Sequence, residues 1–400
     1  MIEISNLRKY HMGGGIVRLE VDVNFTDMIS PYPEKTIYLE IDKAHGDMLV
    51  DDNYDAFVLI PLYLAMYHKQ DLHICGNVSK KLYQNVKWYI QKILCDFAND
   101  LSPAKLTVDG FTSAKPKGNL IGTGISCGVD SLSTIYDHFV RETDPEYRIN
   151  ALFLFNCGAH GTFGDPLTYA TFQGRSRRAV LAANELGLPV YLMNTNFHMF
   201  IHKNDATHTF KSGNDNTRLL FLASYSCILA LQNAIFRYYM SGGVSYSEIK
   251  RFENLSRGDD LAEFCESYFV PLIQTERTEL IVDGCQYRRV EKLQNISDWE
   301  IAQKYLNVCW GRVENAANCG RCPKCLRTLL PLEILGKLDK FSRVFNIEQY
   351  KMNSFAYKSH CLQNYGKDPF ATENIDFAKE HNFPMPKKIE GFLLNGKVLF

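Results

Sequence analysis

A run of small and hydroxyl-bearing residues at positions 122–131 has the composition of a phosphate-binding loop. It follows a short apolar strand predicted over residues 120–125 and leads into a helix predicted over residues 132–140. The start of a helix has unpaired N–H groups and the positive end of the helix dipole. Small residues there let the backbone approach an anion, and Ser126 and Ser131 add hydroxyl donors. The run predicts a phosphate cradle, although the chain contains no Walker A pattern, G-x-x-x-x-G-K-[ST].

Four of the twelve cysteines gather near the carboxyl end, with the spacing C-x9-C-x2-C-x2-C: Cys309, Cys319, Cys322 and Cys325. A C-x-x-C pair directs two thiolates at one tetrahedral Zn²⁺, and the intervening Gly320 and Pro323 favour the necessary turns. Four thiolates leave no open coordination position, so we expect a structural zinc site. A redox dithiol pair and an iron–sulfur cluster are the alternatives for these residues.

The loop also resembles a known family. Its residues resemble the S-G-G-x-D-S signature of the PP-loop ATP pyrophosphatases, with cysteine in place of the first glycine: Ser126-Cys127-Gly128-Val129-Asp130-Ser131. The resemblance implies that these six residues bind ATP with Mg²⁺, and that Asp130 and Ser131 take part in catalysis. In this family a substrate oxygen attacks the α-phosphorus of ATP and pyrophosphate leaves.

The cysteine cluster resembles one branch of that family. Residues 319–327 read C-G-R-C-P-K-C-L-R, which is similar to the C-G-x-C-x-x-C-x-x-R end of the 7-cyano-7-deazaguanine synthases, the QueC family. These enzymes combine a PP-loop with a four-cysteine zinc site. The resemblance implies an ATP-dependent ligase that adenylates a carboxylate, here a 7-deazaguanine acid, and forms an amide or nitrile after amine attack. QueC-like proteins with added domains occur in anti-phage CBASS islands, which suggests a protein acceptor as one option.

Three further residues are site candidates through the same resemblance. Arg289 stands where the family has the lysine of a K-x-E segment, and there it would contact the phosphates. Asn156 and His160 follow the predicted strand 149–155, where the family has a loop that lines the active site. The family's D-C-R-P-E-F-like substrate stretch has no counterpart after Gly243, so its base-recognition contacts are not transferred.

Other functions share these residues. Positions 124–128 also fit G-x-S-x-G, the nucleophile elbow of α/β-hydrolases, in which Ser126 would be the nucleophile and a later His and Asp its partners. A PP-loop enzyme that modifies tRNA and a non-catalytic nucleotide-binding module are further alternatives. Lys+Arg number 44 against 45 Asp+Glu, so no excess of positive charge supports nucleic-acid binding.

The order of predicted elements indicates an α/β fold with a doubly wound parallel sheet, and the PP-loop resemblance implies that this sheet is Rossmann-like and HUP-type. We expect an α+β accessory domain over residues 1–110, a PP-loop domain over 111–345 that includes the zinc site, and an extension over 346–400. The predicted strands cover residues 16–23, 36–41, 72–75, 120–125, 149–155 and 189–193, with a further short strand near 239–240. The predicted helices cover residues 54–67, 80–98, 132–140, 178–186 and 219–239.

Composition sets the broad class of protein. The hydrophobic fraction is 46% and the charged fraction 22%, as in ordinary globular proteins. No amino-terminal signal pattern is present, and no apolar run reaches the roughly 20 residues of a membrane span. We therefore expect a cytoplasmic protein that does not enter a membrane. Its oligomeric state is left open.

Overall fold

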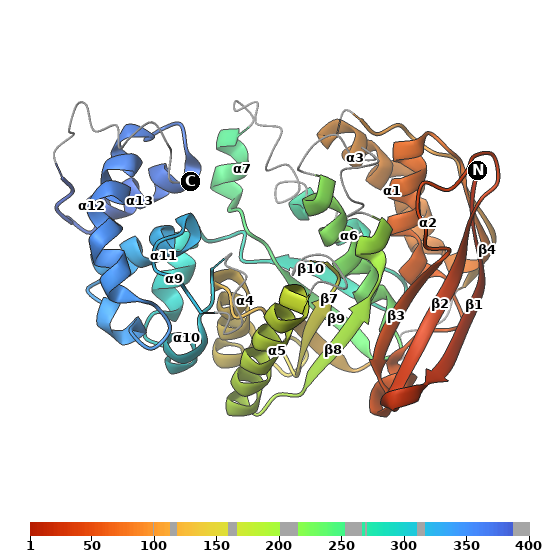
Figure 1. Cartoon of the computed structure of the whole chain (residues 1–400), viewed down its shortest axis with the longest axis horizontal. Helices are drawn as coiled ribbons and strands as arrows, with labels where there is room; N and C mark the ends of the chain where they lie inside the picture. The colour runs from red at the N-terminus through yellow and green to blue at the C-terminus, as the bar shows by residue number, and fades with distance from the viewer. Residues whose placement is uncertain are drawn as a thin grey trace.

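Ten strands form one sheet in the order β10-β9-β6-β7-β8-β3-β2-β1-β4-β5 (Figure 1). The structure is a computed structural model that describes residues 1–98, 100–112, 118–158, 166–200, 215–252, 266–268, 270–309 and 317–386. The strands are β1 (Ile2–Met12), β2 (Ile16–Phe25), β3 (Thr36–Asp42), β4 (Leu72–Ser79), β5 (Leu106–Thr112), β6 (Leu120–Gly124), β7 (Ala151–Asn156), β8 (Val190–Thr195), β9 (Ile235–Ser241) and β10 (Glu279–Asp283).

One half of the sheet is entirely parallel. From β6 the chain steps outward to β7 and β8, then returns to the other side of β6 as β9 and continues to β10. The near-continuous apolar sequence of β7 fits this position, because apolar side chains cover both of its faces. The predicted α/β class with a parallel sheet is confirmed. The strand order reverses at β6, where α/β sheets bind ligands beyond the carboxyl ends of the strands.

The amino-terminal strands extend the same sheet. β3 pairs antiparallel with β8, Leu39 lying opposite Thr195, and β2, β1, β4 and β5 follow outward. The strands predicted over residues 16–23 and 36–41 are confirmed, whereas β1, β5 and β10 were not predicted. The boundary predicted near residue 110 stays a prediction, but the hydrogen-bonded sheet is continuous across the two predicted domains.

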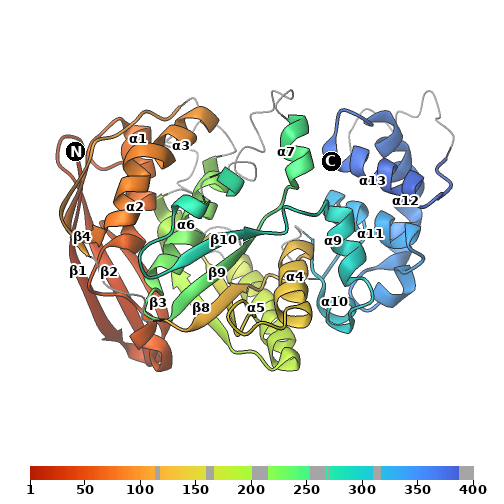
Figure 2. The same cartoon turned by 180° about the vertical axis from the view of Figure 1, so that it is seen from behind.

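Helices cover both faces of the sheet. α1 (Leu59–His68) and α6 (Asp215–Ala230) pack on one face, while α4 (Val129–Ile135) and α5 (Pro166–Leu186) pack on the other. The carboxyl-terminal helices lie at the end opposite the amino-terminal strands (Figures 1 and 2). Further α-helices whose bounds the structure describes are α2 (Lys80–Asn85), α3 (Gln91–Phe97), α7 (Tyr246–Phe252), α9 (Arg289–Ile296), α10 (Glu300–Tyr305), α11 (Pro323–Ile334), α12 (Ile347–Gln363) and α13 (Pro369–Glu380).

The helix predicted over residues 219–239 is wrong in its second half. α6 ends at Ala230, and β9 begins five residues later at Ile235. Gln232 and Asn233 occupy the turn, where their side chains bond to neighbouring segments instead of continuing a helix. The aromatic run that follows fits a buried strand, and Tyr238 and Tyr239 are each 2% exposed on opposite faces of β9.

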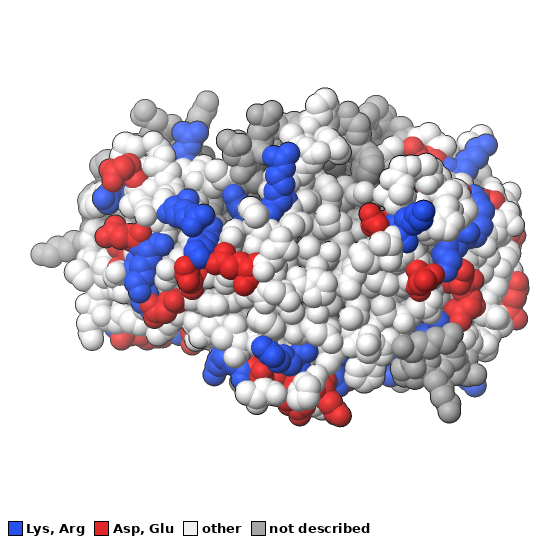
Figure 3. All heavy atoms as spheres, turned by 90° about the horizontal axis from the view of Figure 1, so that it is seen from below, with Lys and Arg blue, Asp and Glu red and all other residues white. Residues whose placement is uncertain are grey.

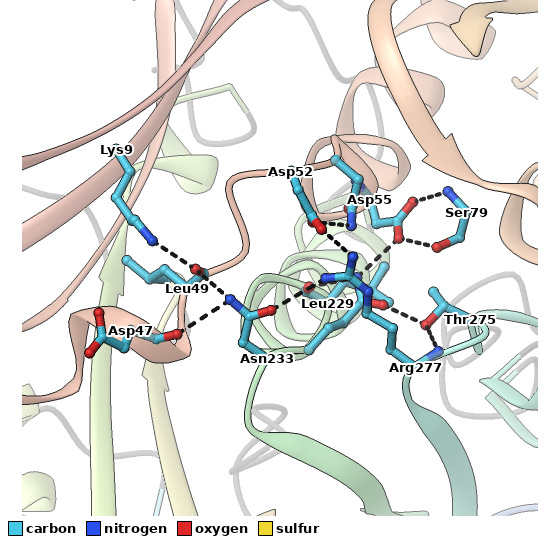
Figure 4. Close-up of polar contacts among 12 residues, drawn as sticks. Lys9, Asp47, Leu49, Asp52, Asp55, Ser79, Leu229, Asn233, Thr275 and Arg277 are labelled. Carbon is cyan, nitrogen blue, oxygen red and sulfur yellow. Dashed lines mark hydrogen bonds and ion pairs between the residues drawn. The ribbon is translucent and has the colours of Figure 1, made fainter. Parts of the chain in front are cut away.

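A buried polar network ties the amino-terminal residues to the parallel half (Figure 4). The fully buried Asp55 carboxylate accepts hydrogen bonds from the Ser79 backbone N–H at 2.7 Å and from Gln232 Nε2 at 3.0 Å. Arg277, which is 1% exposed, forms an ion pair with Asp52. The network joins the segments before α1 and α2 to the turns that precede β9 and β10.

Candidate functional site

The predicted phosphate loop lies at the reversal point of the strand order. It connects β6 to α4, and the carboxyl ends of β7 and β9 flank it on either side. The Cys127 carbonyl accepts the Asn307 backbone N–H at 2.7 Å, which anchors the tip of the loop to the segment after α10. The six loop residues therefore stand where ligands bind in this class of sheet.

Hydrogen bonds of its own hydroxyl groups stabilise the conformation of the loop. Ser126 Oγ and Ser131 Oγ lie 3.1 Å apart, and the Gly128 N–H donates to Ser126 Oγ at 3.2 Å. Cys127 is buried and has a φ of +57°, in the left-handed region that favours glycine. This conformation gives a physical reason for the glycine in the related signature, and it shows that cysteine is accommodated here.

Asp130 is held between two cations from α9. Arg289 NH1 donates to Asp130 Oδ2 at 2.7 Å, and Lys292 Nζ donates to Oδ1 at 3.1 Å. Burial alone would raise the pKa of Asp130, but the charges and hydrogen bonds of Arg289 and Lys292 outweigh it and hold that pKa well below its usual range. The carboxylate is therefore ionised at neutral pH. Arg289 contacts the loop through Asp130, and its predicted contact with the phosphates stays a prediction.

Lys292 is a site residue that the sequence analysis missed. Its side chain is 1% exposed, and Nζ also donates to the Gly242 carbonyl at 2.6 Å, just beyond the end of β9. The signal was present, because Lys292 follows Arg289 by three positions and shares one face of α9. Within the part of the chain that the structure describes, Asp130 and the Gly242 carbonyl are the partners of Lys292 Nζ, which lies behind the loop.

A second polar cluster supports the same region. The Asp283 carboxylate, at the end of β10, accepts hydrogen bonds from Thr134 Oγ1 at 2.7 Å and lies 3.0 Å from His138 Nε2. Burial acts to raise its pKa, but these partners lower it overall. The Asp283 carbonyl accepts the Gly242 N–H at 2.8 Å, so the cluster ties α4 to the ends of β9 and β10.

The carboxyl-terminal extension fixes the start of α9. Glu373 of α13 is 5% exposed and accepts the Val290 N–H at 2.8 Å, while Glu380 pairs with Arg288 through two hydrogen bonds of 3.0 and 2.9 Å. These contacts hold the turn of α9 that carries Arg289. Burial, together with the nearby charge of Glu248, raises the pKa of Glu373 to about 7.

The two residues predicted after the second strand are not shown to meet the loop. Asn156 Nδ2 donates to Asn194 Oδ1 at 3.0 Å, and both amides line a pocket of about 730 Å³ beside α5. Tyr169, Phe172 and Leu192 form much of its apolar wall. His160 lies outside the described residues.

The four predicted cysteines converge. Their sulfur atoms all lie within 4.8 Å of one another, with 3.8 Å between Cys309 and Cys322 and 3.9 Å between Cys319 and Cys325. Four sulfurs around a tetrahedral Zn²⁺, at about 2.3 Å each, stand about 3.8 Å apart. The cluster is therefore able to hold one metal ion.

Local sequence explains the shape of the cysteine cluster. Gly320 has a φ of +73°, and a Cβ there would lie 2.3 Å from the Asn346 carbonyl, so the turn requires glycine. Pro323 begins α11, which carries Cys325. The Asn318 side chain accepts the N–H groups of Val308 and Cys309, which fixes the fourth cysteine beside the other three.

A scan of protein-family models and searches of curated proteins and of solved structures give no match to this chain. In the described part of the chain, no helix is both long enough and apolar enough to cross a membrane. A function is therefore inferred from the sequence motifs and from the geometry of two groups of residues, the ion pairs of Asp130 and the four-cysteine cluster.

Proposed function

We propose that this chain is an ATP-dependent ligase of the PP-loop type, which activates a carboxylate by adenylation and passes the acyl group to an amine. The observation that carries the proposal is the ionised Asp130, held by Arg289 and Lys292 at the end of β6. The parallel strand order, with the loop at its reversal point, supports a Rossmann-like, HUP-type fold.

In this proposal the loop binds the phosphates of ATP. The hydroxyls of Ser126 and Ser131 and the first N–H groups of α4 donate hydrogen bonds to the phosphate oxygens. Arg289 and Lys292 stabilise the negative charge that grows on the departing pyrophosphate. Both oxygens of Asp130 are paired with these two cations, so Mg²⁺ would accompany the phosphates, where its contribution when bound is to neutralise their charge.

The reaction consists of two displacements. A carboxylate oxygen of the substrate forms a bond to the α-phosphorus as the bond to pyrophosphate breaks, which yields an acyl adenylate. An amine then forms a bond to the acyl carbon, AMP leaves with the electron pair, and the amine loses a proton. Adenylation is needed because a carboxylate oxygen is a poor leaving group, whereas AMP is a good one.

The substrate class comes from the QueC resemblance and is part of the proposal. We propose a 7-deazaguanine acid as the carboxylate, with ammonia or a protein amine as the nucleophile and a role in anti-phage defence. The four-cysteine cluster supports this branch of the family, since its sulfurs fit a structural Zn²⁺. A closed site of four thiolates stabilises the segment after α10, which also anchors the loop through Asn307.

The contacts of Ser126 favour a PP-loop enzyme over an α/β-hydrolase. A nucleophile elbow places the strained backbone at the serine, whereas the positive φ here is at Cys127. Among the described residues, Ser126 Oγ contacts Ser131 and Gly128, and it contacts no histidine. Its hydroxyl therefore has no general base in the described part of the chain.

Product analysis tests the proposal. Purified protein is incubated with Mg-ATP and ammonium chloride as the source of the amine, with and without 7-carboxy-7-deazaguanine, and AMP and pyrophosphate are quantified. We expect AMP and pyrophosphate in equal amounts only when the acid is present, and at least a hundredfold less from Asp130→Ala. ATP consumption that yields ADP, or that is unchanged in Asp130→Ala, would show that the loop does not perform this chemistry.

A further inference from the structure

A groove lies at the far edge of the sheet from the loop, between the helical segment 80–97 and the start of β5. It encloses about 310 Å³, and the residues that matter for its chemistry are Tyr83, Lys87, Trp88, Lys92, Lys105 and Leu106. Gln91 Oε1 accepts the Ala104 N–H at 2.8 Å, which fixes the spacing between the helical segment and the strand.

β5 is the last strand of the sheet. Among the described residues it pairs with β4 alone. At the groove the Leu106 carbonyl accepts the Tyr83 hydroxyl at 3.4 Å, so the backbone N–H and C=O groups that no described strand uses belong to the later residues of the β5 edge. A groove between an edge strand and a flanking helix is the setting in which an extended peptide adds to a sheet as a further strand. The geometry thus supplies hydrogen-bonding groups for a peptide backbone.

The charge of this region is positive in a chain whose net charge is −1. Residues 80–105 contain five lysines and two aspartates, a net charge of +3. Lys87, Lys92 and Lys105 line the groove, and no acidic residue is among its lining residues. Lys92 pairs with Asp96 on the helix surface, which leaves Lys87 and Lys105 as the cations best placed to meet an anionic ligand.

Exposed aromatic side chains stand beside these lysines. The Trp88 side chain is 62% exposed, although tryptophan is usually well buried, and Lys87 Nζ lies 4.9 Å from its ring centroid. Tyr89 and Phe111, which are not among the residues that line the groove, are 54% and 46% exposed. Exposed tryptophan and tyrosine are the residue types that carry most of the binding energy at protein interfaces.

We propose that this groove binds an extended, acidic segment of a protein partner, which adds to β5 as an eleventh strand. Its carboxylates would meet Lys87 and Lys105, and an apolar side chain would cover Trp88. A single-stranded nucleic acid would also match lysine and tryptophan, but it has no groups that pair with a strand edge. The groove shares no residue with the phosphate loop or the cysteine cluster, so this proposal does not depend on the proposed ligase activity.

Fluorescence anisotropy with a defined probe tests the inference on the full chain. The probe is a fluorescein-labelled peptide, Glu-Val-Asp-Phe-Glu-Val-Asp, and its matched controls are the same peptide with lysine at every acidic position and one with alternate backbone nitrogens methylated. We expect saturable binding of the acidic peptide alone. Lys87→Glu/Lys105→Glu and Trp88→Ala should each weaken it about tenfold or more, whereas the exposed Lys351→Glu on α12 should not.

Three results would overturn the proposal. One is the absence of acidic-peptide binding to the unaltered chain. Another is equal binding of the N-methylated peptide, because strand addition requires the backbone N–H groups. The third is tighter binding of a labelled oligothymidylate that the same substitutions abolish, which would make the groove a nucleic-acid site. Unchanged circular dichroism and melting temperature of the variants show that any loss of binding is local.

Discussion

At the scale of single residues, the site is organised by charge compensation around Asp130. The negative charge of its carboxylate and the positive charge of the buried Lys292 compensate each other, and Arg289 forms a second ion pair with the same carboxylate. The sequence predicted Asp130 and Arg289 from motif positions. It did not reveal that both join one ion-pair cluster, because the two residues are 159 positions apart.

Removing the charge of Asp130 tests this cluster. Asp130→Asn should destabilise the protein by about 3 kcal/mol at pH 7, because Lys292 is left buried without its counter-ion. The double variant Asp130→Asn/Lys292→Met should be less destabilised than the sum of the two single variants. Urea unfolding of the four proteins measures the coupling, and strict additivity would show that the ion pair contributes nothing.

The ionisation of Asp130 also sets a lower limit to the pH range in which the ion pairs stabilise the folded protein. Since its pKa in the folded protein is depressed, its contribution to stability is present above the pKa of the unfolded chain and is lost as the pH falls through the folded value. The effect of Glu373 on stability has the opposite dependence on pH. Its pKa is raised to about 7 by burial and by Glu248, despite the opposing charges of Arg288 and Arg289. Its ionisation costs stability as the pH rises from about 4.5 to about 7.

Glu373→Gln isolates this second effect. Glutamine keeps an oxygen that accepts the Val290 N–H but does not ionise. We expect the variant to gain on the order of 2 kcal/mol relative to the unaltered protein at pH 8, and to differ little from it at pH 5. Unfolding free energies measured from pH 5 to pH 8 give the comparison. A constant difference between the two proteins at every pH would contradict the raised pKa.

At the scale of elements, periodicity identified the strands that alternate or are buried on both faces, such as β2, β3 and β7. It failed for the region 219–239, where a mainly apolar sequence contains a turn at Gln232 and Asn233 and changes from helix to strand. β10 was missed because its five residues have no distinctive pattern. The cysteine spacing was sufficient to predict the cluster, because ligands so close in sequence leave few ways to separate them.

The cysteine cluster should account for one metal ion per chain. We expect one equivalent of zinc by elemental analysis, and Cys322→Ser or prolonged chelation should remove it and lower the melting temperature by at least several degrees. Cys75→Ser, at a partly buried thiol outside the cluster, is the matched control and should keep its metal. Full metal content in Cys322→Ser would exclude the cluster as the site.

At the scale of the whole molecule, the two predicted domains share one sheet. No local sequence pattern reveals this, because β3 and β8 pair across more than 150 residues. Removing residues 1–110 would expose the edge of β8 and leave Gln232 and Arg277 without Asp55 and Asp52. Buried polar groups that lose their partners are costly, so the pairing indicates that the two parts fold together.

A truncation measures this dependence. We expect residues 111–400 alone to lack a cooperative thermal transition, whereas the full chain unfolds in one. Arg277→Met probes the same junction more gently and should destabilise the full chain, since it removes the partner of Asp52. A soluble, cooperatively folded fragment that binds ATP would support independent domains instead.

The most direct test of the central claim is pyrophosphate exchange. Labelled pyrophosphate enters ATP only if adenylation is reversible on the enzyme, and this step requires no amine. We predict incorporation that depends on 7-carboxy-7-deazaguanine and Mg²⁺, and that falls at least a hundredfold in Asp130→Ala. If the unaltered protein binds ATP but catalyses no exchange with this acid, the proposed substrate is wrong; if it binds no ATP at all, the phosphate loop itself is misassigned.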